Sequence, residues 1–189
     1  MRVTELRKLA SRLDSEMRRK WDRSLPFPEL MSDRWERARS LGFGKEASIH
    51  QSSHVYGDVK VGQKTWIGPF TILDGTGGLT IGEFCSISSG VQIYSHDTVK
   101  WALTRGRAKY EHTPVTIGDC CHIGSQTVVA KGVRIGDHCV IGAHSFVNED
   151  VPPFSIAVGT PARVIGRVRV SADGTVSLSY TKRRVARGR

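Results

Sequence analysis

Aliphatic residues return every six positions along most of this chain. The series shifts by two residues at the stretch DGTGG and breaks once between Ile93 and Ile117. Neither the 3.6-residue period of a helix nor the alternation of a half-buried strand gives a strict period of six. The pattern predicts short strands wound into a solenoid whose stacked coils share one core. Its members are Ile49, Val55, Val61, Ile67, Leu73, Ile81, Ile87, Ile93, Ile117, Ile123, Val129, Ile135, Ile141 and Val147.

Small residues and glycines occupy fixed places within each repeat. Glycine often follows the aliphatic residue, and a small or β-branched residue stands four positions after it. We expect the aliphatic side chain to point inward and the small residue to fit a tight corner, where glycine tolerates positive φ. The number of repeats predicts about five coils.

The break in the series lies in the segment DTVKWALTRGRAKYEHTP, residues 97–114. The expected inward positions hold Arg105 and Glu111, and a charge cannot fill an apolar position without a large desolvation cost. We therefore expect residues 97–114 to form a loop outside the coil, rooted at His96. Long ordered loops on a rigid scaffold often carry function.

The repeats resemble those of the hexapeptide-repeat acyltransferases over roughly residues 46–167. The stretch SHDTVKWALTRGRAKYEHTPVTIGDCCHIGS resembles the loop region of galactoside, maltose and xenobiotic acetyltransferases, through His96, Gly106, Tyr110, Pro114 and TIGD. The resemblance implies an all-β solenoid, namely a left-handed parallel β-helix with N-terminal helices and a protruding active-site loop. It also implies a homotrimer with sites between subunits, acetyl-CoA as co-substrate and His96 as catalytic base.

The chemistry suits a histidine at this place. An imidazole with an ordinary pKa near 6.5 is mostly neutral at pH 7 and can accept a hydroxyl proton. The freed oxygen would attack the thioester, with an N–H donor holding the oxyanion. Asp74, about one coil earlier, is the candidate to orient the histidine, although it could instead cap its own turn. Candidates to contact a sugar ring or its phosphate are Tyr94, Trp101, Arg105 and Tyr110.

The closing segment VIGAHSFVNEDVPPFSIAVGTPARVIGRV resembles the last coil of that family. The resemblance places pantetheine beside a serine and an alanine eighteen residues apart, and the adenine and phosphates beside the following segment. Glu149 departs from the lysine or threonine often found there. Each basic candidate, Arg134 included, could equally be a solvated surface charge. The candidate cofactor-binding residues are Gly124, Ser125, Lys131, Gly142, Ala143, Asn148, Arg163 and Arg167.

Three of the four cysteines occupy the small inward position: Cys85, Cys121 and Cys139. We expect a buried column of free thiols, because a straight column offers zinc no tetrahedral geometry. Acetyl transfer should then be direct. His122 has Thr127 five residues later, so the metal-binding histidine pair of γ-class carbonic anhydrases, which share this fold, is missing. No metal is expected.

The ends of the chain differ from the repeats. Residues 1–45 predict an amphipathic helix and a second helix near 28–40. The β-helix is expected over residues 46–167, a hairpin over 168–181 and a basic, disordered tail over 182–189.

The composition narrows the setting. The chain has 189 residues and a formal net charge of +10, which fits an anionic partner such as CoA or a nucleotide-linked sugar. A role with nucleic acid rests on charge alone, because no recognition motif accompanies it. There is no apolar run long enough to span a membrane and no secretory-type leader, so we expect a cytoplasmic location.

The leading functional prediction is an acetyl-CoA-dependent acetyltransferase acting on a sugar hydroxyl, of a polysaccharide precursor or a small sugar. The first alternative is N-acetylation of a nucleotide-linked amino sugar, since one base serves both acceptors. The alternatives from other classes are a non-catalytic β-helix scaffold and a metal-dependent enzyme like the γ-carbonic anhydrases.

Overall fold

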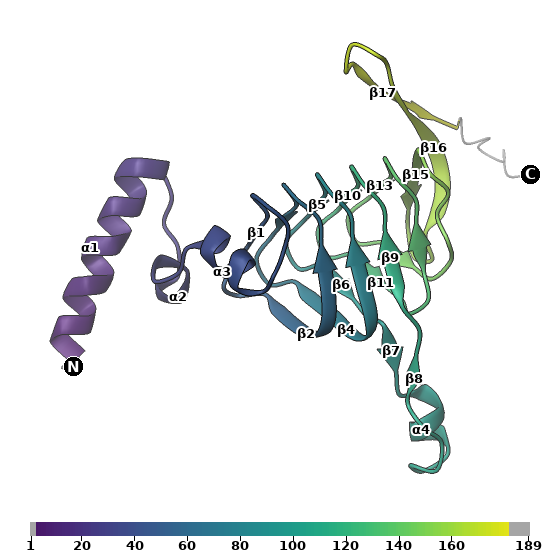
Figure 1. Cartoon of the computed structure of the whole chain (residues 1–189), viewed down its shortest axis with the longest axis horizontal. Helices are drawn as coiled ribbons and strands as arrows, with labels where there is room; N and C mark the ends of the chain where they lie inside the picture. Colours follow the sequence, from purple (N-terminus) through teal and green to yellow (C-terminus); the bar gives the residue numbers. More distant parts are fainter. Residues whose placement is uncertain (1–2, 182–189) are drawn as a thin grey trace, which may run out of the picture.

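The computed structural model describes residues 3–181, and its body is a parallel β-helix preceded by helices (Figure 1). The expected left-handed parallel β-helix with N-terminal helices and a protruding loop is confirmed. The helices are α1 (Val3–Trp21), α2 (Phe27–Leu30), α3 (Arg34–Ser40) and α4 (Val99–Leu103). The strands are β1 (Ser48–Ile49), β2 (His54–Val61), β3 (Trp66–Ile67), β4 (Ile72–Ile81), β5 (Ser86–Ile87), β6 (Gln92–Ile93), β7 (His96–Asp97), β8 (Glu111–His112), β9 (Val115–Ile117), β10 (His122–Ile123), β11 (Val128–Val129), β12 (Arg134–Ile135), β13 (Val140–Ile141), β14 (Phe146–Val147), β15 (Ser155–Val158), β16 (Arg163–Val170) and β17 (Val176–Tyr180).

The strands form three parallel stacks, one for each side of the coil. The first stack runs β1, β3, β5, β10, β13 and β15. The long strands β2 and β4 each turn a corner and take part in two stacks. Their first halves begin the second stack, which continues with β6, β11 and β14. Their second halves begin the third stack, which continues with β9 and β12. Each short strand is thus one rung of a ladder, and successive coils share its hydrogen bonds.

The first stack has six rungs, so the expectation of about five coils was one coil short. The sixth rung is β15, which pairs in parallel with β13. Its segment follows the two prolines Pro152 and Pro153, where the six-residue spacing ends, and Ala157 rather than a large aliphatic residue stands opposite Ile141. The last coil therefore stacks on the β-helix without carrying the repeat.

The aliphatic residues of the repeat form the core, as the period predicted. Thirteen of the fourteen are buried, most with less than 2% of their surface exposed. The exception is Val55, which is half-buried, because β2 is the outermost rung of the second stack and pairs on that side only with β4. Burying one such side chain contributes about 1.5–3 kcal/mol, so the repeats dominate the stability of the fold.

The N-terminal helices cover the first coil. The single helix expected near residues 28–40 is in fact two, α2 and α3, because Asp33 starts a new helix by accepting hydrogen bonds from the amides of Trp35 and Glu36. Ala38 of α3 is buried against the β-helix, whereas α1 buries no residue and stands away from the coils (Figure 1).

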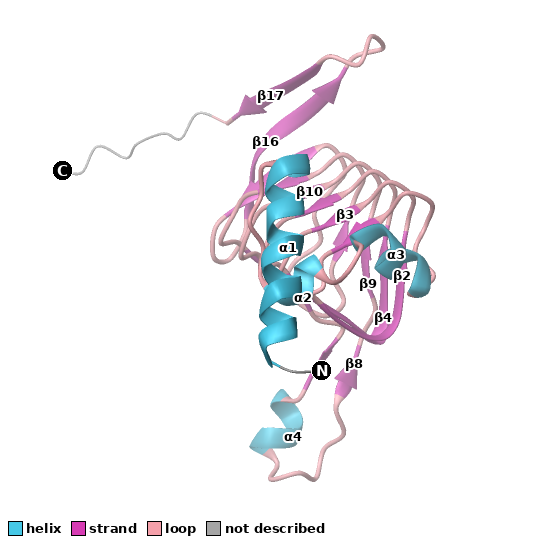
Figure 2. Ribbon diagram, turned by 90° about the vertical axis from the view of Figure 1, so that its left-hand side faces the viewer, coloured by secondary structure: helices cyan, strands magenta, loops and turns pink. Residues whose placement is uncertain are grey.

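Two appendages project from opposite sides of the solenoid (Figure 2). One is the segment between β7 and β8, whose antiparallel stem carries α4 at its end. The other is the hairpin of β16 and β17, which starts before the expected residue 168 because β16 pairs with both β15 and β17. The basic tail expected over residues 182–189 lies outside the described residues.

Within residues 3–181, no helix has the length and apolar character that crossing a membrane requires.

The stacked core makes a stability prediction. Ile123 is completely buried in the third-from-last rung of the first stack, so Ile123→Ala should lower the free energy of unfolding by about 2–5 kcal/mol. Leu103→Ala, at a loop residue that is 80% exposed, should change it by no more than about 0.5 kcal/mol. Urea unfolding at one protein concentration compares the two variants; equal effects would contradict the assignment of the core.

Candidate active site

An aspartate and a histidine from neighbouring coils meet where the protruding segment leaves the β-helix. Leu73 and Ile93 pair in register, so the residues that follow them reach the same corner. There the carboxylate oxygen Oδ2 of Asp74 lies 2.5 Å from Nδ1 of His96. The Asp74 side chain is 2% exposed and that of His96 is 32% exposed. The pair thus has a buried acid and a partly open imidazole.

Hydrogen bonds hold the carboxylate of Asp74 from several sides. The amide and hydroxyl of Thr76 donate to Oδ1 at 3.0 and 2.7 Å, and the amide of Ser95 donates to Oδ2 at 3.0 Å. Ser95 is itself buried, and its hydroxyl accepts the amide of Gly77 at 2.8 Å. These donors leave the carboxylate little freedom to rotate, so the direction of its contact with His96 is fixed.

Burial favours the neutral form of Asp74, but the hydrogen bonds from Thr76, His96 and Ser95 outweigh it, so the pKa of this carboxyl lies below its ordinary value. A depressed pKa means that the ionised group stabilises the folded state above the ordinary carboxyl pKa. That contribution is lost as the pH falls through the depressed value. At neutral pH Asp74 is therefore a carboxylate that can only accept hydrogen bonds.

The ionised aspartate determines which nitrogen of His96 carries the proton. Nδ1 must donate to Asp74, and the hydroxyl oxygen of Thr76, 3.0 Å from Nδ1, can share the same proton because its own hydrogen points to Asp74. In the neutral imidazole the lone pair is then on Nε2. His96 can accept a proton at Nε2 while Asp74 stabilises the imidazolium that results.

The stem of the protruding segment places a second imidazole beside the first. β7 and β8 pair His96 with His112, and the two rings stack with centroids 5.8 Å apart. Their neighbours Asp97 and Glu111 both contact Lys131, at 3.2 and 2.8 Å from Nζ. Lys131 therefore ties the stem to the β-helix.

Glu111 also receives a hydrogen bond from Lys100 at the start of α4. The bonds from Lys100 and Lys131 lower the pKa of Glu111 to about 2. Lys131, expected beside CoA, is thus placed at the root of the loop and paired with two carboxylates. The sequence could not reveal this, because Asp97 is separated from Lys131 by the whole loop and Glu111 lies 20 residues before it.

The other loop candidates lie further from the aspartate–histidine pair. The rings of Trp101 and Tyr110 pack edge to face, 5.6 Å apart, and Arg105 is exposed near them with φ 54°. Tyr94 lies at the root instead. Its hydroxyl donates to Gln92, and burial together with the charge of Asp74 raises its pKa.

The serine and alanine expected to line a pantetheine groove lie in stacked turns. The amide of His144 donates to the carbonyl oxygen of Ser125 at 2.9 Å, which joins the two turns. A Cβ added to Gly124 would lie 2.4 Å from the amide nitrogen of Ala143, so the close approach requires glycine. A Cβ on Gly142 would lie 2.6 Å from Val158 in the next coil. Ser125 and Ala143 themselves remain exposed.

The two arginine candidates of the last coil lie at different places. Arg163 lies 3.4 Å from Glu149, next to the exposed Asn148. Arg167 lies at the opposite end of β15, where its guanidinium donates to the hydroxyl of Ser155 at 3.2 Å. The structure therefore does not place Arg167 beside Arg163.

Within one chain the two candidate half-sites lie at opposite edges of the second stack. The turns of Ser125 and Ala143 precede the strands β11 and β14, whereas Lys131 and Asn148 follow them. His96 follows β6 in the same stack and so lies at the second edge. A molecule that contacts both half-sites of one chain would have to cross the face between them.

The cysteine column has the expected form. Cys85, Cys121 and Cys139 are buried, and their thiols contact the carbonyl oxygens of Gly118, Gly136 and Pro152, each at 3.1 Å. All are free thiols, and Cys120 is exposed. Among the described residues no cluster of three or more histidine, cysteine or acidic side chains could hold a metal ion.

Residues 114–149 match the family described as bacterial transferase hexapeptide (six repeats). The crystal structure of a maltose O-acetyltransferase from Clostridium difficile 630 is similar to this structure, with TM-score 0.66 and 26% sequence identity over 88% of each chain. The chain is therefore similar to the hexapeptide-repeat transferases, in the sequence of residues 114–149 and in its fold.

Curated relatives share parts of this chain. The galactoside O-acetyltransferase of Escherichia coli (strain K12) is 51% identical over 55 residues, which are 29% of this chain and 27% of that protein. A serine acetyltransferase of Mycobacterium tuberculosis (strain ATCC 25618 / H37Rv) is 32% identical over 108 residues, 57% of this chain and 45% of that protein. The chain spans between 27% and 60% of the length of the first curated relatives it matches.

Sequence reasoning missed three residues of the candidate site: Thr76, Ser95 and His112. Thr76 and Ser95 look like ordinary small residues of a turn, and nothing in the sequence marks them as partners of Asp74. His112 did carry a signal. It stands at the end of the loop that His96 opens, and an antiparallel stem brings the two ends of a loop together.

The contact between Asp74 and His96 makes a prediction about the imidazole itself. Asp74→Asn can offer Nδ1 an amide donor, which would favour a proton on Nε2 and remove the lone pair there. Nitrogen-15 NMR at slightly alkaline pH should show His96 protonated at Nδ1 in the parent protein, with a shift toward Nε2 in the variant. The matched control is Asp97→Asn, whose carboxylate contacts Lys131 instead. The same tautomer in all three proteins would exclude an orienting role for Asp74.

Proposed function

We propose that this chain is an acetyl-CoA-dependent acetyltransferase that acetylates a sugar hydroxyl, with His96 as the general base. The observation that carries the proposal is the Asp74–His96 contact of 2.5 Å at the root of the protruding segment. It supplies a proton acceptor on a rigid coil, next to a loop with exposed aromatic and basic side chains. The names of the maltose and galactoside O-acetyltransferases support the choice of a sugar acceptor.

The proposed reaction needs one base and no acyl-enzyme intermediate. Nε2 of His96 takes the proton of the acceptor hydroxyl as its oxygen bonds to the thioester carbonyl carbon. The tetrahedral intermediate then collapses, the bond to sulfur breaks, and the imidazolium returns the proton to the departing CoA thiolate. Asp74 stabilises the positive charge that His96 carries between these steps. Direct transfer is favoured because the thiols of the coil are buried.

The stacked turns of Ser125 and Ala143 fit the role of a pantetheine groove. Gly124 and Gly142 keep the surface flat by bringing successive coils into close contact, and exposed backbone at such turns can bond the amides of an extended chain. Arg163 and Asn148, exposed near the last coil, are the proposed contacts for the nucleotide end of CoA. Arg163 would exchange its surface pairing with Glu149 for a phosphate.

We also propose that the working enzyme is a homotrimer whose sites form between subunits. The turns of Ser125 and Ala143 lie at one edge of the second stack and His96 at the other, so a neighbouring subunit would bring the groove edge of one chain next to the histidine edge of another. In a cyclic trimer of identical subunits each interface is heterologous, so it brings two different surfaces of the chain together.

Amine acceptors remain the alternative within the same site. His96 could deprotonate the ammonium of a nucleotide-linked amino sugar as it does a hydroxyl, and serine is a third acceptor suggested by the name of one relative. The acceptor that is turned over decides among them.

The first test is thiol release from acetyl-CoA over free sugars, nucleotide-linked amino sugars and serine. His96→Ala should lower kcat by about 10²–10⁴-fold and leave CoA binding, measured by calorimetry, unchanged. His112→Ala, which removes the neighbouring ring, is the matched control and should retain most of the activity. CoA binding without turnover would mean that the acceptor is outside the panel. Absence of CoA binding would favour the scaffold alternative and reject the enzyme.

A second test addresses the shared site. His96→Ala and Ala143→Trp should each be inactive, the first without a base and the second with a blocked groove. Mixed trimers of the two variants should recover about a quarter of the parent activity, because that fraction of interfaces pairs two intact halves. No recovery in trimers of verified mixed composition would place the site within one chain. A monomer mass of 20.9 kDa by light scattering would reject the trimer.

A further inference from the structure

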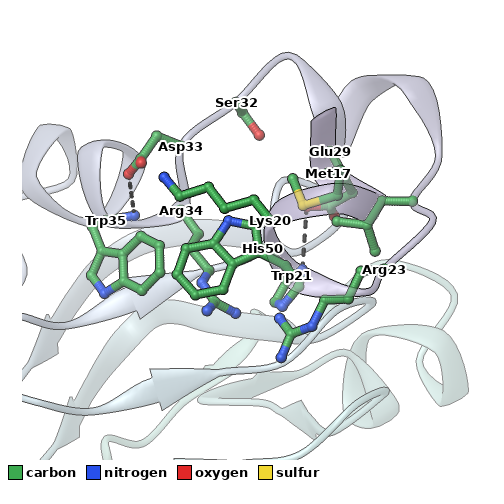
Figure 3. A pocket seen from close by; sticks show the side chains of 11 residues that line it. Met17, Lys20, Trp21, Arg23, Glu29, Ser32, Asp33, Arg34, Trp35 and His50 are labelled. Atoms are coloured by element: carbon green, nitrogen blue, oxygen red, sulfur yellow. Dashed lines mark hydrogen bonds and ion pairs between the residues drawn. The ribbon is translucent and has the colours of Figure 1, made fainter. Parts of the chain in front are cut away.

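A cavity of about 450 Å³ lies between the N-terminal helices and the first coil (Figure 3). Its lining comes from α1, α2, α3, the connections between them and His50, which follows β1. His96 belongs to the third coil, and none of the residues used in the proposed transfer lines the cavity. The volume falls in the range of small-molecule sites. The cavity is therefore separate from the candidate active site.

Three cationic side chains line this cavity without a carboxylate partner. Lys20, Arg23 and Arg34 make no ion pair within residues 3–181. Arg34 is half-buried, and burial, followed by the charge of Arg23, lowers its pKa. Cations that repel one another in a partly buried place are stabilised by an anion between them.

Two acidic residues share the lining, and other groups already hold their carboxylates. Glu29 lies 3.2 Å from Nδ1 of His50 and accepts the hydroxyl of Ser52 at 2.7 Å. Glu29 accepts the amides of Gln51 and Ser52 at 3.0 and 2.8 Å, and it anchors α2 to the first coil. Asp33 accepts the amides that begin α3. The charges of both acids attract Arg34, but neither forms an ion pair with the three cations, whose N–H groups can therefore contact a ligand.

Aromatic rings complete the lining. The guanidinium of Arg34 lies over the Trp35 ring, 4.2 Å from its centroid, and Lys20 lies 5.2 Å from the centroid of Trp21. A guanidinium that contacts an indole through its face can still direct N–H groups to two oxygens of a phosphate. The Trp21 indole is 51% exposed and offers an apolar face on which a planar ring can stack.

We propose that this cavity binds a nucleoside phosphate, with the base against Trp21 and the phosphate held by Arg23 and Arg34. Inorganic phosphate alone would leave the indole face unused, and an uncharged aromatic molecule would leave the cations unpaired. A nucleotide satisfies both. The inference does not depend on the proposed acetyl transfer.

The test is calorimetric titration of the full-length protein with AMP, GMP, CMP and UMP, and with inorganic phosphate, in the presence of saturating CoA. At least one nucleotide should bind, and more tightly than phosphate. Arg34→Gln and Arg23→Gln should each weaken that binding about tenfold or more, as expected for loss of a charge-assisted contact. The matched control is Arg39→Gln, an exposed residue of α3 that does not line the cavity.

Trp21→Ala distinguishes the two parts of the contact. It should weaken nucleotide binding and leave phosphate binding unchanged. The proposal is overturned if no nucleotide binds saturably, if phosphate binds as well as every nucleotide, or if the two arginine variants match the control. Displacement of the nucleotide by CoA would assign it to the CoA groove and also overturn the proposal. A protein that binds a nucleotide but not CoA would retain this inference while the proposed enzyme fails.

Discussion

Backbone hydrogen bonds between successive coils fix the positions of the candidate functional groups on the β-helix, the aspartate–histidine pair among them. The amide of Ile72 donates to Val91 at 2.9 Å and that of Tyr94 to Val129 at 3.0 Å. These bonds hold the rungs in register, so a residue at a corner always has a corner residue of the next coil beside it. The inward aliphatic side chains enforce that register, because a shift by one position would expose the core.

The aspartate–histidine pair depends on that register in two ways. It brings Asp74 to the corner where His96 lies, and it supplies the backbone amides that keep the buried carboxylate ionised. Without Thr76 and Ser95 the burial of Asp74 would favour its neutral form, and a neutral acid would not select the tautomer with a free Nε2. The rigid coil thus contributes to chemistry as well as to stability.

The parts outside the repeat are not constrained by its six-residue spacing, and they carry the exposed binding groups. The protruding segment presents Trp101 and Tyr110. The N-terminal helices line a cavity of their own with cations that form no ion pair within residues 3–181. In both places charged and aromatic side chains are exposed, whereas the coil interior holds mainly aliphatic side chains, with cysteine, serine and threonine at the corners. This division lets the same β-helix support different ligands at its edges and at its end.

The six-residue period by itself determined the solenoid, the inward residues, the cysteine column and the loop between Ile93 and Ile117, because inward positions must be apolar at fixed spacing. The pairing of Asp74 with His96 was one of two readings, and the structure brings the two side chains into contact. Only the tertiary structure placed Lys131 against the loop stem and added Thr76, Ser95 and His112 to the site. Apart from that of Thr76, which lies in the same turn as Asp74, these contacts join residues on different coils or on opposite ends of a loop. Such distances close only when the coils stack, so local sequence carries no signal for them.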